Sequence, residues 1–213
     1  MEILVIGSEP QLKEVMAKFG ETHQYVCLAS EATEVPFGKY SVVFDFVTSD
    51  QSASLYKDHP SLIVFADTTF CSLSQWGADK FQCTVFGFCG LPTFLNREIL
   101  ETSLSTEDHR PALERICLTL STKYQIVADK VGLVTPRVIC MIINEAYYTV
   151  EEGTATKDDI DLAMKLGTNY PYGPFEWCTR IGSRNVCRLL EAMFSETKDS
   201  RYTICSSLLS KLD

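Results

Sequence analysis

The sequence predicts an α/β sheet domain followed by an all-helical domain. Up to about residue 128, short and nearly continuous apolar runs alternate with helical or loop segments. This alternation is typical of a parallel sheet covered on both faces. From residue 129 onward the apolar residues recur at helical spacing, which indicates helices throughout. We therefore expect a sheet domain over residues 1–128 and a helical domain over residues 129–213.

Five buried strands are expected in the first domain, at residues 2–7, 25–29, 40–47, 62–66 and 81–88. Between the first two, residues 11–19 carry apolar side chains at helical spacing. Asp108 opens a second helix that ends near Leu120 and tolerates Pro111 in its first turn. Residues 124–128 form either a last strand or an extended link.

The second domain begins with a long helix that has Pro136 in its first turn, reaches Glu152 and places Gly153 at its C′ position. Thr156, with an acidic residue three positions on, resembles a capping box and opens a helix over residues 158–166. Gly167 is expected to stop that helix.

Three more helices complete the second domain. Pro174 suits the first turn of one, Ser183 is an expected N-cap for residues 184–194, and Ser200 an expected N-cap for a helix up to residue 212. Residues 138–143 are apolar on every side. Such a segment needs cover all round, either from its own domain or from a second subunit.

Composition excludes several classes of function. The chain has 213 residues, is 46% hydrophobic and carries a formal net charge of −9, which disfavours nucleic acid binding. We find no signal peptide pattern at the start and no apolar run of the roughly 20 residues that a membrane helix needs, so we expect a cytoplasmic protein. The nine cysteines form no CxxC pair, and we expect reduced, mostly buried thiols and no metal site.

Several sequence blocks of the second half occur in the order and spacing of a known family. They are Asn144-Glu145-Ala146, Glu151-Glu152-Gly153, Asp158-Asp159-Ile160-Asp161, Ala163-Met164-Lys165-Leu166-Gly167 and Pro171-Tyr172-Gly173-Pro174-Phe175-Glu176. From residue 132 to residue 190 the chain closely resembles the C-terminal helical domain of the 3-hydroxyacyl-CoA dehydrogenase family. A weaker resemblance covers residues 40–47, 66–69 and 79–88 of the first half.

The resemblance implies a Rossmann-like domain, trimmed here, followed by a dimer-forming helical dehydrogenase C-terminal domain of the 6-phosphogluconate-dehydrogenase-like kind. It also implies hydride transfer between NAD and the 3-hydroxyl carbon of an acyl-CoA. In this family a histidine is the general base, a glutamate orients it, and serine and asparagine side chains assist. Imidazole suits this role because it titrates near the working pH.

The cofactor signature departs from the family. A G-x-G-x-x-G loop gives a tight turn and close approach of the pyrophosphate, but residues 7–12 read Gly-Ser-Glu-Pro-Gln-Leu. Glu9 places a carboxylate and Pro10 removes a backbone N–H where the pyrophosphate would lie. The family implies NAD, and the candidate cofactor residues are Gly7, Ser8 and Glu31, the last for the adenosine ribose.

The catalytic signature departs as well. Where the family reads His-Phe-Phe-Asn-Pro, residues 85–89 read Val-Phe-Gly-Phe-Cys, so Val85 or Phe86 replaces the base. Pro136 stands in the position of the asparagine. Thr69 is the candidate for the serine position and Glu98 for the orienting glutamate.

Histidines and tyrosines are the remaining residues that bear on the site. We interpret the three histidines, His23, His59 and His109, as solvated surface residues. Tyr170 and Tyr172 are candidates for the substrate loop, with packing as the alternative.

Three functions remain open. The first is a pseudoenzyme of fatty acid metabolism that keeps an acyl-CoA-like ligand or another binding partner. The second is an NAD-dependent oxidoreductase with an altered site, and the third a heterodimerisation partner of a full-length family member. A homodimer through the second domain is expected, with a dimer helix that contributes Val138, Met141, Ile142, Glu145 and Tyr148.

Overall fold

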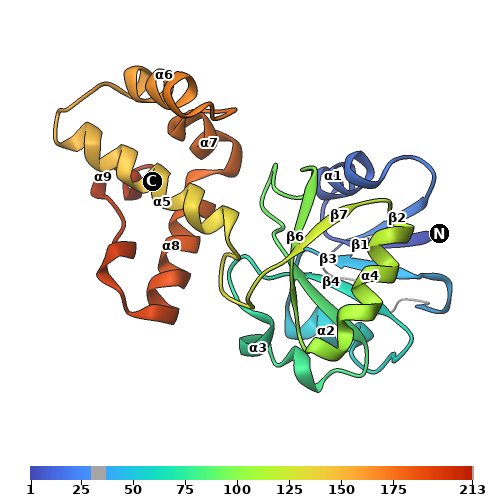
Figure 1. The fold of residues 1–213 in the computed structure, drawn as a ribbon. Helices are drawn as coiled ribbons and strands as arrows, with labels where there is room; N and C mark the ends of the chain where they lie inside the picture. Colours follow the sequence, from blue (N-terminus) through green and yellow to red (C-terminus); the bar gives the residue numbers. More distant parts are fainter. Residues whose placement is uncertain (30–36, 213) are drawn as a thin grey trace. The chain divides into compact units, whose positions relative to one another are not determined.

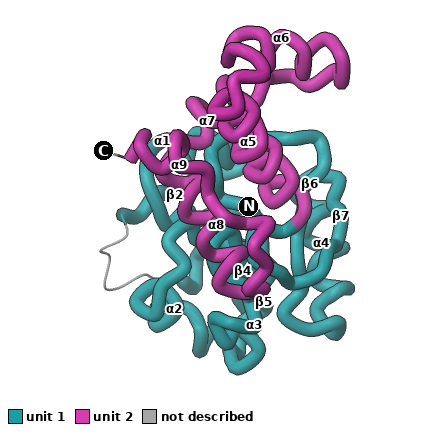
Figure 2. The backbone as a smooth tube through the Cα atoms, turned by 90° about the vertical axis from the view of Figure 1, so that its left-hand side faces the viewer, with its two compact units in different colours: residues 1–133 teal, residues 134–213 magenta. Residues whose placement is uncertain are grey.

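The computed structural model describes residues 1–29 and 37–212 and separates into two compact units, Met1–Leu133 and Val134–Asp213 (Figure 2). The division lies a few residues beyond the boundary expected at residue 128. Residues that follow that point are tied to unit 1, because the Asp129 carboxylate accepts 2.8 Å hydrogen bonds from the backbone N–H groups of Leu73 and Ser74. In the described part of the chain, no helix is long and apolar enough to cross a membrane.

The described strands of unit 1 form one sheet in the order β2-β1-β3-β4-β5-β6-β7 (Figure 1). Their bounds are β1 (Glu2–Ile6), β2 (Gln24–Leu28), β3 (Val42–Asp45), β4 (Ile63–Asp67), β5 (Thr84–Phe88), β6 (Ile99–Leu104) and β7 (Lys123–Ile126). The five strands predicted from the sequence are confirmed and are mutually parallel where they pair. Residues 124–126 belong to a strand rather than to a link.

One edge of the sheet is not parallel, contrary to the prediction. β6 was not predicted at all, and it pairs antiparallel to β5, with Phe86 opposite Leu104 and Gly87 opposite Ser103. A parallel neighbour needs a crossover of a dozen or more residues, and residues 89–98 are too few for one. Beyond it, β7 pairs parallel to β6.

Helices cover the sheet between the strands. They are α1 (Glu9–Phe19), α2 (Asp50–Tyr56), α3 (Leu73–Trp76) and α4 (Arg110–Thr119), with single 3₁₀ turns at Phe37–Lys39, Ala78–Lys80 and Glu107–His109. The sequence predicted α1 and α4. Asp108 does not open α4, however, because it lies in the preceding 3₁₀ turn and the N-cap is His109. It missed α2, a polar segment whose start is capped by Ser49, which accepts a hydrogen bond from the Ser52 backbone N–H.

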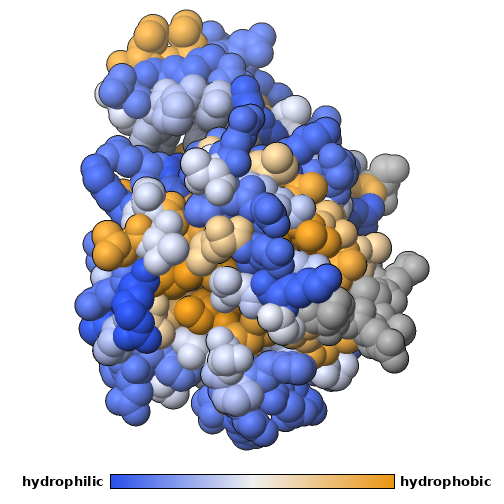
Figure 3. All heavy atoms as spheres, turned by 90° about the vertical axis from the view of Figure 1, so that its right-hand side faces the viewer, coloured by the Kyte–Doolittle hydropathy of each residue, from blue (hydrophilic) through white to orange (hydrophobic). Residues whose placement is uncertain are grey.

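Alternating residues of the strands divide the core of unit 1 into two clusters. In β1, Ile3 and Val5 belong to one buried cluster, and Leu4 and Ile6 to the other. This division follows from the period of two along a strand and explains why the strands read as continuous apolar runs. The exterior is mixed, as the face in Figure 3 shows, where hydrophobic residues lie among hydrophilic ones.

Unit 2 is helical. It contains α5 (Thr135–Glu151), α6 (Lys157–Thr168), α7 (Pro174–Ile181), α8 (Ser183–Thr197), a 3₁₀ turn at Ser200–Tyr202 and α9 (Ser206–Leu209). Several predicted signals are confirmed. Pro136 lies in the first turn of α5, Gly153 follows its end with φ 71°, and Thr156 caps α6 by accepting from the Asp159 backbone N–H.

Two predicted helix ends, at Gly167 and Ser183, are wrong. Gly167 does not stop α6, which continues to Thr168 and ends at Asn169 in the left-handed conformation, φ 56°. Asparagine supports that conformation through its short polar side chain, so the glycine is not needed as the cap. At α8 the N-cap is Gly182, φ 90°, and Ser183 is the first helical residue.

The segment after α8 also contains less helix than predicted. Ser200 begins only a 3₁₀ turn, and α9 starts after Cys205. The Glu151 carboxylate accepts hydrogen bonds from the Ser206 hydroxyl at 2.6 Å and the Ser207 backbone N–H at 2.7 Å. These hydrogen bonds attach the first turn of α9 to the C-terminal end of α5.

The apolar run of α5 is only partly covered within its own unit. Ile139, Cys140 and Ile143 are buried, whereas Val138 is 49% exposed and Met141 and Ile142 are half-buried. One side of the run thus packs inside unit 2 and the other remains open.

Candidate functional site

The N-terminus of α1 lies where an open α/β sheet would bind a dinucleotide, beyond the carboxyl end of β1. Here it is capped by its own third residue. The Gln11 amide oxygen accepts hydrogen bonds from the Ser8 backbone N–H at 2.7 Å and from the Ser8 hydroxyl at 2.9 Å. The Ser8 backbone N–H and the Ser8 hydroxyl, which could have donated to a phosphate, are therefore both engaged by the Gln11 side chain.

Space at this turn is limited as well. A Cβ atom added at Gly7 would lie 2.5 Å from the Gln11 amide oxygen and 3.3 Å from Phe46 Cβ. Pro10 stands in the first turn and brings no N–H, and the Glu9 carboxylate belongs to the same turn. These residues do not fit a pyrophosphate. The third candidate of the cofactor site, Glu31, lies outside the described residues.

The two positions predicted to replace the catalytic base lie inside the sheet. Val85 and Phe86 are fully buried in β5, where Val85 pairs with Val64 and Phe86 with Phe65 of β4. Ligands bind such sheets beyond the carboxyl ends of the strands, so neither side chain is placed for chemistry. β5 ends at Phe88, and the residue that follows its carboxyl end is Cys89.

Three side chains gather around the end of β5. Continuing the antiparallel register of β5 and β6 by two residues places Glu101 opposite Cys89. Burial lowers the pKa of the third side chain, Arg97, and the charges of Cys89 and Glu101 oppose that lowering. The Arg97 guanidinium also lies over the Phe94 ring, 4.4 Å from its centroid. The sequence did not predict this cluster, since it depends on the unrecognised strand β6.

Glu98, the predicted orienting glutamate, lies just before β6. Its side chain is 76% exposed and forms a 2.6 Å ion pair with Lys123 at the start of β7. The hydrogen bond and charge of Lys123 lower the pKa of Glu98. Glu98 is therefore a surface ion-pair partner, and the glutamate opposite the end of β5 is Glu101.

Thr69 lies beside the end of β5, although it is fully buried. Its hydroxyl donates to Asp67 Oδ1 at 2.5 Å and is 3.4 Å from the Cys89 sulfur. Asp67 also accepts from the backbone N–H groups of Thr69 and Gly90, both at 2.9 Å. Burial raises the pKa of Asp67, and these hydrogen bonds oppose the rise. The structure thus brings Thr69 and Cys89 together, with the hydroxyl proton directed to a carboxylate.

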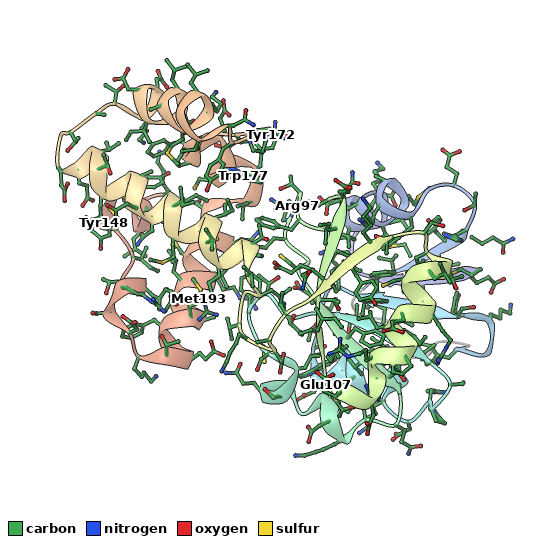
Figure 4. The ribbon with its side chains drawn as sticks, in the orientation of Figure 1. Arg97, Glu107, Tyr148, Tyr172, Trp177 and Met193 are labelled. Carbon is green, nitrogen blue, oxygen red and sulfur yellow. The ribbon has the colours of Figure 1, made fainter. Side chains whose placement is uncertain are left out.

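The substrate-loop tyrosines behave differently from each other. Tyr172 packs edge-on against Trp177, with centroids 4.9 Å apart, and its ring carries the Arg180 guanidinium at 3.9 Å (Figure 4). Tyr170 is half-buried. Tyr172 thus has packing partners within unit 2.

The loop before α7 is held by hydrogen bonds to α6. The Asp161 carboxylate accepts from the backbone N–H groups of Phe175 at 2.8 Å and Glu176 at 3.2 Å. A Cβ at Gly173 would lie 2.5 Å from the Asp161 Cα, so only glycine allows this approach. The blocks that carry the family resemblance here hold α6 against α7.

The histidines are more constrained than predicted. His109 Nδ1 forms a 2.8 Å hydrogen bond with the Ser105 hydroxyl, and His23 is half-buried with its pKa lowered by burial. Only His59 is exposed, and its ring packs against Phe37, 5.0 Å between centroids. In the described residues no three metal-ligating side chains cluster.

The predicted dimer helix is α5. Val138 is exposed, Met141, Ile142 and Tyr148 are half-buried and Glu145 is exposed, so these residues mark one open side of the helix. The Tyr148 hydroxyl lies 3.4 Å from the Thr203 carbonyl oxygen, to which it donates (Figure 4). Val134, 49% exposed, extends the open side toward the start of α5.

Comparison with known proteins identifies the second unit. Residues 132–213 match the model of the 3-hydroxyacyl-CoA dehydrogenase C-terminal domain. Over 82 residues, the chain is 44% identical to 3-hydroxyadipyl-CoA dehydrogenase of Escherichia coli, a match that covers 38% of this chain and 17% of that protein. It is 29% identical over 157 residues to 3-hydroxybutyryl-CoA dehydrogenase of Bradyrhizobium diazoefficiens, covering 70% of this chain and 53% of that one.

The fold of the whole chain matches more widely than its sequence. The crystal structure of FadB2 from M. tuberculosis superposes with a TM-score of 0.79 over 99% of this chain and 92% of that chain, at 17% identity. The curated relatives above are matched over about half of their length or less. Residues 132–213 therefore form a C-terminal domain of the 3-hydroxyacyl-CoA dehydrogenase family, and the chain as a whole shares the fold of FadB2.

Proposed function

We propose that this protein does not transfer hydride between NAD and a 3-hydroxyacyl-CoA, and acts as a binding or interaction protein. The observation that carries the proposal is the capped turn at α1, where Gln11 engages both Ser8 donors. Binding a dinucleotide there requires that Gln11 leave and that a phosphate approach Glu9. Displacing these hydrogen bonds removes about 0.5–1.5 kcal/mol each before any contact with the phosphate forms.

The end of β5 supports the same proposal independently. General base catalysis contributes typically 10²–10⁴-fold in rate. The side chain at the strand's end is a thiol, Cys89, and the hydroxyl beside it is directed to Asp67. Loss of the cofactor turn and loss of the imidazole are separate changes, so restoring one would not restore the reaction.

A thermal-shift titration of the full chain tests this proposal. NAD and NADH are each added with and without acetoacetyl-CoA. A ligand at 100 times its Kd stabilises a protein by about 2.7 kcal/mol, so binding is readily detected. We expect no saturable shift with either dinucleotide. A saturable rise with NAD or NADH would refute the proposal, and a rise with acetoacetyl-CoA alone would identify the retained ligand.

We further propose that the open side of α5 forms a homodimer interface. The specific observation is the pair of exposed valines, Val134 and Val138, one helical turn apart beside the half-buried Met141. Apolar side chains at this spacing form a stripe that burial against a second helix would stabilise.

Size-exclusion chromatography with light scattering tests the interface. We expect a dimer for the natural chain and a monomer for Val138→Glu. The matched control is Leu166→Glu on α6, which is 78% exposed and should leave the dimer intact. A natural chain that is monomeric alone but forms mixed dimers with a full-length family member would replace the homodimer by a heterodimer.

A further inference from the structure

A solvent-open cavity of about 410 Å³ lies in unit 2. It is lined by Tyr147, Lys157, Phe175, Cys178, Thr179, Gly182, Ser183 and Lys211. Small-molecule sites in proteins span roughly 300–1,000 Å³, so this volume suits a compact ligand. Tyr147 is three turns along α5 from Pro136, the position of the family's asparagine, so this cavity is not the site of that residue.

One wall of the cavity is aromatic. The rings of Tyr147 and Phe175 meet edge to face, with centroids 5.0 Å apart. The Lys157 ammonium lies 5.4 Å from the Tyr147 centroid and 5.5 Å from the Phe175 centroid. The cation is thereby held over the ring pair at the first turn of α6.

Two lysines, Lys157 and Lys211, are among the residues that line the cavity. Lys157 and Lys211 both lie near the buried Cys178 sulfur, because the charge of each lowers the pKa of that thiol against a larger rise from burial. Among the described residues, neither lysine has a carboxylate within ion-pair distance. The protein as a whole carries a net charge of −9. The two lysines at this cavity therefore contrast with the negative net charge of the chain.

Polar groups on a third side complete the cavity. α8 begins there with Gly182 as its N-cap and Ser183 as its first residue, and no side chain caps this helix. The N-terminus of a helix of this length carries about half a positive charge. The Gly182 N–H donates to the Cys178 carbonyl oxygen and the Asn185 N–H to the Gly182 carbonyl oxygen, which leaves the N–H groups of Ser183 and Arg184 for an anion. The exposed Thr179 adds a hydroxyl, although its proton is directed to the Phe175 carbonyl oxygen at 3.0 Å.

We propose that this cavity binds a small organic anion, with its carboxylate or phosphate held between Lys157, Lys211 and Ser183 and its apolar part against Phe175. The site goes beyond the proposed loss of hydride transfer and does not depend on it. Its chemistry is recognition of an anionic oxygen group joined to a compact apolar body, and the two head groups are distinguished by experiment.

Titrations of the ¹⁵N-labelled full chain followed by NMR test the proposal. The probes are benzoate and phenyl phosphate, with neutral benzamide as the matched control for shape. We expect saturable shifts of the backbone resonances of Thr179, Gly182 and Ser183 with one or both anions, and much weaker binding of benzamide. Which anion binds more tightly assigns the head group.

Variants test the role of the two lysines. Lys157→Gln and Lys211→Gln should each weaken binding about twofold to fivefold, as expected for exposed ion pairs. The control Lys198→Gln removes the same charge at the end of α8, outside the cavity, and should leave affinity unchanged. Raising the salt concentration to about 1 M should weaken binding of the anions, since exposed charges are then screened.

Three results would overturn the proposal. They are absence of saturable shifts up to about 10 mM of either anion, equal binding of benzamide, and equal effects of the Lys198 and cavity-lysine substitutions. Folding of each variant is verified from its unperturbed resonances elsewhere, so a loss of binding is not confused with a loss of structure.

Discussion

Asn144 is the residue whose removal should damage unit 2 most specifically. It is buried on α5, where its Nδ2 donates to the Thr203 carbonyl oxygen at 2.8 Å and its Oδ1 accepts from the Cys205 backbone N–H at 2.9 Å. These two bonds attach the segment before α9 to α5. Cys205 is fully buried, so its N–H has no access to water once Asn144 is truncated.

The magnitude follows from these two partners. An unsatisfied buried donor costs about 1–3 kcal/mol, and the lost bond to Thr203, whose residue is exposed, about 1 kcal/mol. We expect Asn144→Ala to lower the free energy of unfolding of unit 2 by about 2–4 kcal/mol. Glu145→Ala, the exposed neighbour, should change stability by less than about 0.5 kcal/mol.

Urea unfolding followed by tryptophan fluorescence measures the effect. The chain has two tryptophans, Trp76 in unit 1 and Trp177, buried in unit 2. In a Trp76→Phe background, Trp177 reports unit 2 alone. A loss below about 1 kcal/mol in Asn144→Ala, or a loss equal to that in Glu145→Ala, would refute the reasoning.

Three further predictions concern individual side chains. Lys123→Gln should raise the pKa of Glu98 toward its ordinary value, because the hydrogen bond from Lys123 is the main cause of its lowering; carboxyl NMR titration measures this, and an unchanged pKa would show that another group sets it. Burial raises the pKa of Asp67 in the folded state, so the stability it contributes is present below the unfolded value of about 3.9 and is lost as pH rises through the folded value. Asp67→Asn should therefore gain stability relative to the natural chain as pH rises from about 4, and parallel pH profiles in urea unfolding would contradict this. Gly167→Ala should stabilise unit 2 by about 0.5–1 kcal/mol, since Gly167 lies inside α6 with open space around its Cα and Asn169 provides the left-handed cap; a loss of stability would indicate that the glycine ends the helix after all.

Local patterns in the sequence predicted most of the fold. Buried strands such as residues 2–6 read as apolar runs because both faces of the sheet are covered. In unit 2, Pro136, Gly153 and Thr156 marked helix ends through their own backbone preferences, which need no knowledge of tertiary contacts.

Features that depend on distant partners were missed. β6 contains the fully buried polar residues Thr102 and Ser103, and the Thr102 hydroxyl is satisfied by the Gly87 carbonyl oxygen at 2.8 Å. No apolar run marks such a strand. The register of β5 and β6 places Glu101 opposite Cys89, and it cannot be derived unless β6 is recognised. The sequence therefore predicted Glu98 as the orienting glutamate instead of Glu101.

The candidate site shows the same limit. The absence of a glycine-rich turn was visible in the sequence, but its replacement by the Gln11 cap depends on a side-chain rotamer. The cavity of unit 2 joins residues from Tyr147 to Lys211, and no local spacing connects them. Nothing in the sequence distinguishes its two lysines, Lys157 and Lys211, from other surface lysines.

The most direct measurement of the central claim is a turnover assay of the full chain with NADH and acetoacetyl-CoA, followed by NADH absorbance. A catalytically active family member run in parallel confirms the reagents. The account predicts no oxidation of NADH above the rate without protein. Saturable turnover that is abolished by Cys89→Ala would contradict it and would assign the chemistry to the thiol at the end of β5.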